Sequence, residues 1–198
     1  MNQEQAKAQL IEFLRNFPQL DEETLLALAD MIPVIAPKKG TVLLKEGEKQ
    51  KECYYVLQGL VREYQFLDGT ERTTAFYSEA NGTVSSVHYG DQSPSKIYLT
   101  CMEDCLLIAG NLELDESHFK QFPVLLEITK QMLENDLNKA KDQYSNFILS
   151  SPKDRYLQFM ESRPELMNRV SLQQIASYLG MTPESSSRIR KRIVSPSN

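Results

Sequence analysis

The sequence predicts an α+β fold that ends in a helix-turn-helix. Seven of the eight glycines fall between positions 40 and 110, spaced roughly ten residues apart, with short β-rich runs between them. This pattern is typical of an antiparallel sheet of short strands. After the sheet, residues 117–149 contain no glycine and show helical periodicity. Two short helices joined by a glycine-containing turn are expected near the carboxyl end.

Two helices are expected before the sheet, over Gln3–Phe17 and Asp21–Ile32, because apolar residues recur there at helical spacing. Asp21 is expected to cap the second helix, since Glu22 and Glu23 occupy its first turn. No gap between the strands holds a full crossover helix, which predicts antiparallel pairing. The six expected strands are Thr41–Lys45, Cys53–Gln58, Leu60–Phe66, Arg72–Tyr77, Lys96–Cys101 and Cys105–Ala109.

One long helix is expected from about Ser117 to Leu149, ended by Pro152 because proline disfavours helix in the residue before it. Apolar residues recur along it at spacings of three, four or seven, as in a coiled coil. Such a helix can pack on its own domain, but its length and position favour pairing with a second copy. These residues are Leu126, Leu133, Leu137, Ala140, Tyr144 and Phe147.

These elements predict three parts of the chain. Residues 1–116 form a sheet domain with its amino-terminal helices, residues 117–150 a dimerisation helix, and residues 151–198 a DNA-binding domain. The charge is divided in the same way. The chain carries −5, yet residues 151–198 hold eight basic and four acidic residues, a charge of +4, which leaves −9 on residues 1–150. A basic segment attached to an acidic remainder of the chain is typical of a nucleic-acid-binding protein with a separate sensor domain. A solvated arginine-rich helix end has the same composition.

The composition excludes several classes of protein. No window approaches 18 consecutive apolar residues, so no membrane span is expected, and the first residues lack the pattern of a secretory signal. Three cysteines argue against a disulfide scaffold and for the cytoplasm. Only two histidines are present and there is no Gly-x-Ser-x-Gly motif, so we expect neither a histidine-rich zinc site nor an enzyme. No cofactor is expected.

Residues 171–193 contain the most specific motif of the sequence. Ser171 and Gln174 have the spacing of a capping box, which starts a helix. Gly180 suits the left-handed position after that helix. Thr182 is expected to cap a second helix, with Pro183 at its first position, where a missing N–H costs nothing.

The second helix is expected to present a polar face to DNA, although such a face can also be ordinary solvated surface. Glu184, Ser187, Arg188 and Lys191 share this face by helical spacing. Arg188 can donate two hydrogen bonds to guanine, and Glu184 can accept one from cytosine. Ile189 and Ile193 are expected to point inward. The predicted DNA-binding residues are Gln173, Thr182, Glu184, Ser185, Ser187, Arg188, Arg190, Lys191 and Arg192, of which the last three would neutralise phosphates.

The whole chain resembles the Crp/Fnr family of bacterial transcription regulators. The resemblance rests on 40–43 (Gly-Thr-Val-Leu), 46–48 (Glu-Gly-Glu), 55–62, 68–71 (Asp-Gly-Thr-Glu) and above all 175–184. It implies a cyclic-nucleotide-binding-like β-roll, a long dimerisation helix and a C-terminal reader of the winged-helix type. The fumarate-nitrate branch reads DNA through a Glu-x-x-Ser-Arg pattern, which this chain matches at Glu184, Ser187 and Arg188. The resemblance further implies a homodimer on a palindromic site, RNA polymerase as a partner and a small-molecule effector.

The chain departs from the family at its effector site. Cyclic-AMP binders use an Arg-Ser-Ala motif for the cyclic phosphate, and Pro94-Ser95-Lys96 stands there instead. Proline offers neither charge nor donor, so we do not expect cyclic AMP to bind tightly. By their place in the family's pocket, the candidates to line an effector site are Ser85, Ser86, His88 and Lys96.

Other departures concern the cysteines and the second helix. No cysteine precedes Cys53, so the amino-terminal ligands of an iron–sulfur cluster are missing, and Cys101 and Cys105 are expected to be buried small residues. Ser186 falls on the inward face, where the family has an aliphatic residue, so Ser186→Leu is expected to be stabilising. Only five residues follow Ile193, too few for a wing hairpin.

The function predicted from the sequence is a sequence-specific transcription regulator with an unknown effector. The alternative is a ligand-sensing or protein-interaction module on a β-roll that no longer reads DNA. The departure at Ser186 and the acidic body of the chain keep this alternative open.

Overall fold

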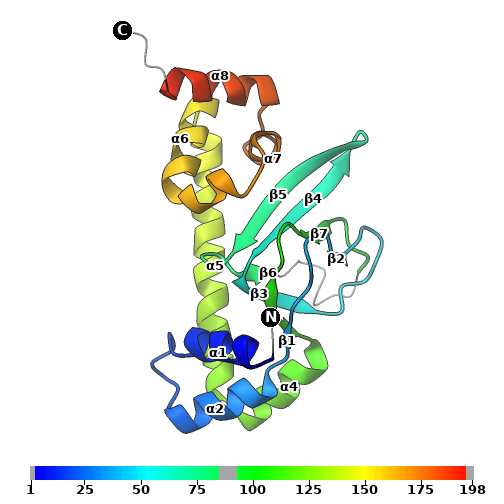
Figure 1. The fold of residues 1–198 in the computed structure, drawn as a ribbon, viewed down its shortest axis with the longest axis vertical. Helices are drawn as coiled ribbons and strands as arrows, with labels where there is room; N and C mark the ends of the chain where they lie inside the picture. The colour runs from blue at the N-terminus through cyan, green and yellow to red at the C-terminus, as the bar shows by residue number, and fades with distance from the viewer. Residues whose placement is uncertain (1–2, 85–92, 195–198) are drawn as a thin grey trace. The chain divides into compact units, whose positions relative to one another are not determined.

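The computed structural model describes residues 3–84 and 93–194 (Figure 1). The chain divides into two compact units. The first comprises Met1–Glu63 and Phe76–Asp136, and the second comprises Tyr64–Ala75 and Leu137–Asn198. Within the described residues, no helix combines the length and apolar character needed to cross a membrane. The three domain limits expected from the sequence remain a prediction.

The first unit begins with two helices, α1 (Gln3–Leu14) and α2 (Glu22–Met31). The cap predicted for α2 is confirmed, because the N–H of Thr24 donates to Asp21 Oδ1 over 2.7 Å. The prediction that the first helix reaches Phe17 was wrong. The side-chain amide of Asn16 instead donates to the carbonyl of Phe13, and Pro18 disfavours helix in the residue before it.

Two four-stranded sheets follow, in the orders β1-β8-β3-β6 and β2-β7-β4-β5. The registers of β1, β2, β3, β6, β7 and β8 are antiparallel, as the short connections predicted. All six expected strands form. The two-residue strands β1 and β6 were not expected, since they are too short for a periodic signal. The strands are β1 (Val34–Ile35), β2 (Val42–Leu44), β3 (Cys53–Gln58), β4 (Leu60–Leu67), β5 (Thr70–Ser78), β6 (Thr83–Val84), β7 (Tyr98–Cys101) and β8 (Leu106–Gly110).

The main core of the first unit is formed by side chains from both sheets. Val56 of β3, Leu99 of β7 and Leu107 of β8 are almost completely buried in one cluster. The next residue of β8, Ile108, points the other way and packs against a second cluster built on α1 and α2. This alternation follows from the two-residue repeat of a strand. The helices therefore cover the outer face of the sheet that contains β3 and β8.

Two tight turns depend on backbone conformations with positive φ. Asp68 and Gly69 join β4 to β5 with φ of 52° and 72°, as in a two-residue hairpin. Gly59, between β3 and β4, has φ of 101°, and a Cβ there would lie 2.7 Å from Cys105 Sγ. Only glycine fits this close approach.

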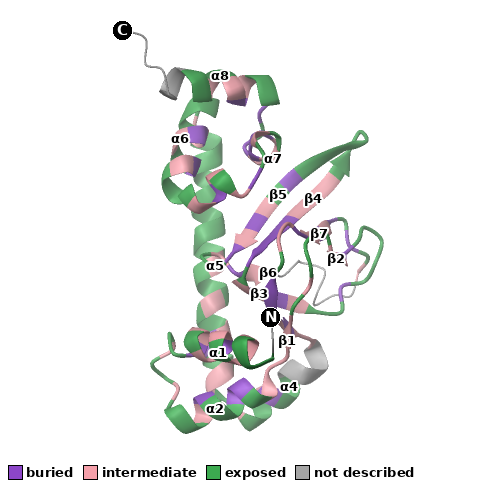
Figure 2. Ribbon diagram, viewed as in Figure 1, coloured by how far each residue is buried: buried purple, intermediate pink, exposed green. Residues whose placement is uncertain are grey.

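The long helix predicted over Ser117–Leu149 is interrupted, so that prediction was wrong at its beginning. The structure has two helices, α4 (Leu112–Gln121) and α5 (Val124–Leu149), separated at Phe122 and Pro123. Proline lacks the N–H that a continuous helix needs and disfavours helix in Phe122. The carboxyl end was predicted correctly, because α5 ends at Leu149. Figure 2 shows that α5 is exposed over most of its length.

The second unit contains four short helical elements after α5. Ser151 caps the first of them, because it accepts a hydrogen bond from the N–H of Asp154. Tyr156, Leu166, Ile175 and Ala176 are at most 1% exposed and form its interior. The elements are α6 (Pro152–Ser162), the 3-10 helix η1 (Pro164–Asn168), α7 (Leu172–Tyr178) and α8 (Pro183–Val194).

Candidate nucleic-acid interface

The first helix of the predicted helix-turn-helix starts as its sequence indicates. The N–H of Gln174 donates to Ser171 Oγ over 3.2 Å, and the N–H of Ser171 donates to Gln174 Oε1 over 3.1 Å. The capping box is therefore complete and fixes the first residue of α7. Gln173, one of the predicted DNA contacts, is exposed on this helix.

The turn between α7 and α8 requires glycine for two reasons. Gly180 has φ of 66°, which side chains other than glycine's rarely adopt. A Cβ at this position would also lie 3.2 Å from Cζ of Phe147 in α5. The N–H of Met181 donates to the carbonyl of Ala176 over 2.8 Å, which closes the helix end. The predicted role of Gly180 is confirmed.

The second helix begins at Pro183, as predicted. The N–H of Ser185 donates to Thr182 Oγ1 over 3.2 Å, and the Thr182 hydroxyl lies 3.1 Å from Ser185 Oγ. Thr182 is thus the cap of α8, so its hydroxyl is occupied by the helix. Contacts of Thr182 and Ser185 with DNA remain predictions.

The outward face of α8 carries the acid and the guanidinium that the sequence predicted. Glu184 and Arg188 are exposed, and Ser187 is half-buried between them. Hydrogen bonds from its own backbone N–H and from the Thr182 hydroxyl lower the pKa of the Glu184 carboxyl. Glu184 is therefore ionised near neutral pH and can accept a hydrogen bond from a base amino group.

The basic residues of α8 are placed partly as predicted. Arg190 and Lys191 are exposed. The side chains of Arg192 and Ile193 lie outside the described part of the chain. Arg188 donates from Nε to the backbone carbonyl of Glu184 over 3.4 Å, which anchors its side chain against the helix.

The inward face of α8 is anchored by Ser186, in agreement with the predicted helix phase. Ser186 is 0% exposed, and its hydroxyl oxygen has no hydrogen-bond partner within the described part of the chain. Ile189, one turn later, is half-buried. A buried hydroxyl without a partner is a net cost to folding.

One of the four effector candidates, Lys96, lies within the described residues. Ser85, Ser86 and His88 lie outside them. Lys96 is exposed, between buried Ser95 and Ile97. The Ser95 hydroxyl accepts from the N–H of Ile97 and lies 3.0 Å from the carbonyl of the same residue. Its hydrogen bonds are therefore used within the loop.

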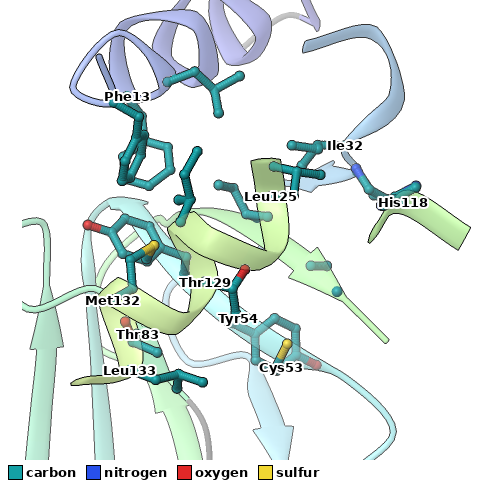
Figure 3. Close-up of a pocket in the computed structure, with 18 of the residues that line it drawn as sticks. Phe13, Ile32, Cys53, Tyr54, Thr83, His118, Leu125, Thr129, Met132 and Leu133 are labelled. Atoms are coloured by element: carbon teal, nitrogen blue, oxygen red, sulfur yellow. The ribbon is translucent and has the colours of Figure 1, made fainter. Parts of the chain in front are cut away.

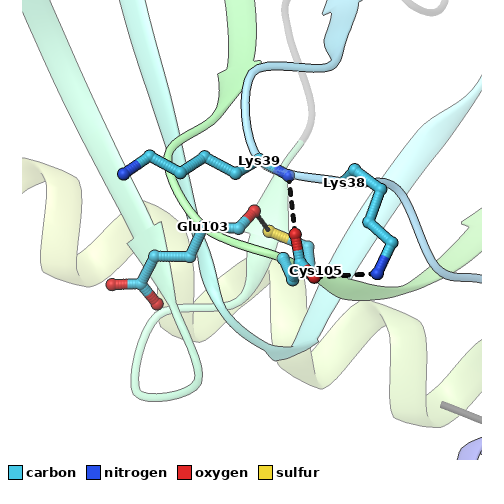
Figure 4. A network of polar contacts seen from close by, with 5 residues as sticks. Lys38, Lys39, Glu103 and Cys105 are labelled. Atoms are coloured by element: carbon cyan, nitrogen blue, oxygen red, sulfur yellow. Dashed lines mark hydrogen bonds and ion pairs between the residues drawn. The ribbon is translucent and has the colours of Figure 1, made fainter.

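Cys101 and Cys105 are 1% and 3% exposed, so the prediction that they are buried is confirmed. The two thiols are hydrogen-bonded to each other. This bond and burial both raise the pKa of Cys101, whereas the same bond lowers the pKa of Cys105 against the opposing effect of burial. Figure 4 shows the turn around Cys105, whose Sγ lies 3.4 Å from the carbonyl oxygen of Glu103. Among residues 3–84 and 93–194, no cluster of three metal-ligating side chains is found.

The same turn is held to the segment before β2 by a polar network. The carboxylate of Asp104 accepts from the Lys38 ammonium over 2.8 Å and from the backbone N–H of Lys39 over 2.9 Å (Figure 4). These bonds lower the pKa of Asp104. They join this turn to Lys38 and Lys39 at the surface, where the Lys38 and Asp104 side chains are both exposed.

Sequence reasoning missed a cavity of about 410 Å³ in the first unit. Its walls come from six elements, α1, β3, β6, β8, α4 and α5, with lining residues between Phe13 and Leu133. The apolar residues that line it are ordinary members of a helical or strand pattern. No local signal distinguishes them from residues of a closed core.

No protein-family profile and no curated protein matches the chain. Solved structures do match. FixK2 from Bradyrhizobium japonicum is 20% identical with a TM-score of 0.67, over 82% of this chain and 84% of FixK2. A CooA mutant from Carboxydothermus hydrogenoformans is 16% identical with a TM-score of 0.67, over 93% of this chain and 84% of CooA.

A third match is the c-di-GMP responsive global regulator CLP of Xanthomonas campestris. It is 19% identical with a TM-score of 0.65, over 88% of this chain and 92% of CLP. These structures are regulators of the Crp/Fnr type, and this chain has their fold.

Proposed function

We propose that this chain, with the fold of the Crp/Fnr regulators, is a sequence-specific DNA-binding transcription regulator. The observation that carries the proposal is the geometry of α7 and α8. A complete capping box, a left-handed glycine turn and a second capped helix leave Glu184 and Arg188 exposed on one face. A polar helix face of this kind fits the major groove of a duplex.

In this proposal α8 is the recognition helix. Arg188 donates a pair of hydrogen bonds to O6 and N7 of guanine, and Glu184 accepts one from N4 of cytosine. Arg190, Lys191 and Arg192 neutralise phosphates and set the register on the backbone. In the same proposal Gln173 of α7 and the first-turn residues of α8 contact the DNA backbone.

The regulator acts as a homodimer through α5. The predicted apolar stripe of this helix is exposed in the single chain: Leu133 is 51%, Leu137 56% and Tyr144 69% exposed. Water contact along so regular a stripe is unfavourable, and pairing with a second copy removes it. A twofold dimer would read a palindromic site, with half-sites about one helical turn apart.

The remaining parts of the proposal are an effector other than cyclic AMP, a cytoplasmic location and RNA polymerase as a partner. The loop at the position of the family's cyclic-phosphate site supports an effector other than cyclic AMP. It has Pro94 in place of arginine, and the hydroxyl of Ser95 is bonded to Ile97. We expect no enzymatic activity.

One observation supports the alternative, a β-roll module that has lost specific DNA reading. The buried hydroxyl of Ser186, on the inward face of the recognition helix, has no partner among the described residues and destabilises the packing of that helix. A helix that is held loosely would position its base-reading side chains poorly.

Measuring binding to random genomic DNA fragments over a series of salt concentrations distinguishes the two proposed functions. A sequence-specific DNA-binding protein loses affinity steeply as the salt concentration rises, because its binding releases counterions from the DNA phosphates. It also enriches a single sequence motif. A module that does not read DNA enriches no motif at any salt concentration.

A further inference from the structure

The cavity of the first unit lies between the helices and the sheet that contains β3 and β8, and Tyr54 and Ala109 of the main core form part of its wall. Figure 3 shows Phe13 of α1 on one side, Leu125 and Thr129 of α5 on another, and Tyr54 of β3 below them. The cavity measures about 410 Å³, within the usual range for sites that hold small molecules.

Its walls are mainly apolar and aromatic, and one of them is rigid. The rings of Phe13 and Tyr55 lie 4.5 Å apart between centroids. On its other side the Tyr55 ring packs directly on the backbone, because a Cβ added to Gly82 would lie 2.7 Å from it. The ring therefore has no room to swing aside, and this wall is formed before any ligand binds.

One polar side chain of the wall has no hydrogen-bonding partner among the residues that the structure describes. His118 of α4 lines the cavity and is only 9% exposed, and no hydrogen bond to its ring is found within residues 3–84 and 93–194. Tyr54, by contrast, already donates to Glu52 over 2.9 Å. The ring nitrogens of His118 are therefore left to water or to a ligand in this cavity, which can supply a hydrogen-bonding partner.

We propose that this cavity binds a small, mainly apolar molecule that carries one hydrogen-bonding group, and that His118 contacts this group. The aromatic wall of Phe13 and Tyr55 favours a flat or aromatic body. Thr129 and Met132 of α5 are at the opposite side of the space from His118 (Figure 3), so the molecule would lie across the cavity. This site is independent of the proposed DNA-binding surface, which belongs to the other unit.

The test uses the full chain without DNA and the fluorescent probe N-phenyl-1-naphthylamine. We expect saturable binding with one probe per chain. Thr129→Phe fills the cavity and should weaken probe binding about tenfold or more. Lys130→Phe is the matched control, because it adds the same ring one residue later at an exposed position of the same helix. It should bind the probe like the wild type.

A second measurement tests the role of His118. Displacement of the probe should require about five- to tenfold less 4-propylphenol than 4-propyltoluene, since only the phenol offers a hydrogen-bonding group. His118→Leu should abolish this preference and still bind the probe. Thermal melts of each variant establish that it is folded.

Four results would overturn the proposal. One is the absence of saturable binding to the wild type. Another is equal binding by Thr129→Phe and Lys130→Phe, and the third is a phenol preference that survives in His118→Leu. Leu133 also lines the cavity and belongs to the apolar stripe of α5. Probe binding only in a monomeric variant would show that a second copy fills the space, which equally contradicts the proposal.

Discussion

The Nε atom of Arg188 lies 3.4 Å from the backbone carbonyl oxygen of Glu184, one turn earlier in α8. This bond anchors the arginine stem on the helix and leaves the two terminal guanidinium nitrogens for an external acceptor. Those are the nitrogens that a bidentate contact with guanine can use. The bond therefore restrains the guanidinium of Arg188 on the helix before DNA is present.

Replacement of Arg188 tests base reading. Arg188→Ala should cost about 1–3 kcal/mol of binding free energy and relax the preference at one position of each half-site, because a bidentate contact is lost. Fluorescence anisotropy with the preferred duplex and with single-base variants measures both effects. Unchanged selectivity would show that Arg188 does not contact a base.

Replacement of Lys191 should give a different signature. Lys191 is exposed near the end of the described part of α8 and is expected to meet a phosphate. Lys191→Ala should therefore weaken binding to all sequences alike and reduce the salt slope by about one. Anisotropy titrations at several salt concentrations supply the slope. A change in base preference would show that Lys191 contacts a base edge and not a phosphate of the DNA backbone.

The local features of this helix pair were predictable from sequence because each depends on neighbouring residues. The capping box at Ser171, the glycine at 180 and the proline at 183 act through bonds or conformations within a few positions. The six main strands were found for the same reason, since the alternation of side chains is a local pattern.

Other features depend on contacts that a local pattern does not contain. The short strands β1 and β6 exist only because β8 and β3 pair with them. The cavity beside His118 needs walls from six elements. The break at Pro123 was visible in the sequence, but the apolar spacing on either side of it outweighed the proline in the prediction.

Dimerisation can be tested at the centre of the exposed stripe of α5. Leu137→Glu places a charge on this face and should convert the dimer to a monomer, measured by analytical ultracentrifugation. Asn135→Glu is the matched control, because it adds the same charge to an exposed position on the opposite face of the helix. A wild-type chain that sediments as a monomer would contradict the proposed pairing.

The buried hydroxyl of Ser186, on the inward face of α8, predicts a stabilising substitution. Ser186→Ala removes a polar atom that has no partner and adds no volume, so it should stabilise the second unit by about 1 kcal/mol. Thermal unfolding followed by circular dichroism should show a higher midpoint. Ser187→Ala, at the half-buried neighbouring position, should leave the midpoint nearly unchanged. A lower midpoint for Ser186→Ala would mean that the hydroxyl has a partner.

The central claim is that α8 reads DNA sequence, and selection from a pool of randomised duplexes tests it most directly. The wild-type chain should converge on an inverted repeat whose half-sites are centred about ten base pairs apart. The variant with both Glu184→Ala and Arg188→Ala should bind the pool without converging. Failure of the wild type to enrich any motif, or convergence of both proteins on the same one, would contradict the account.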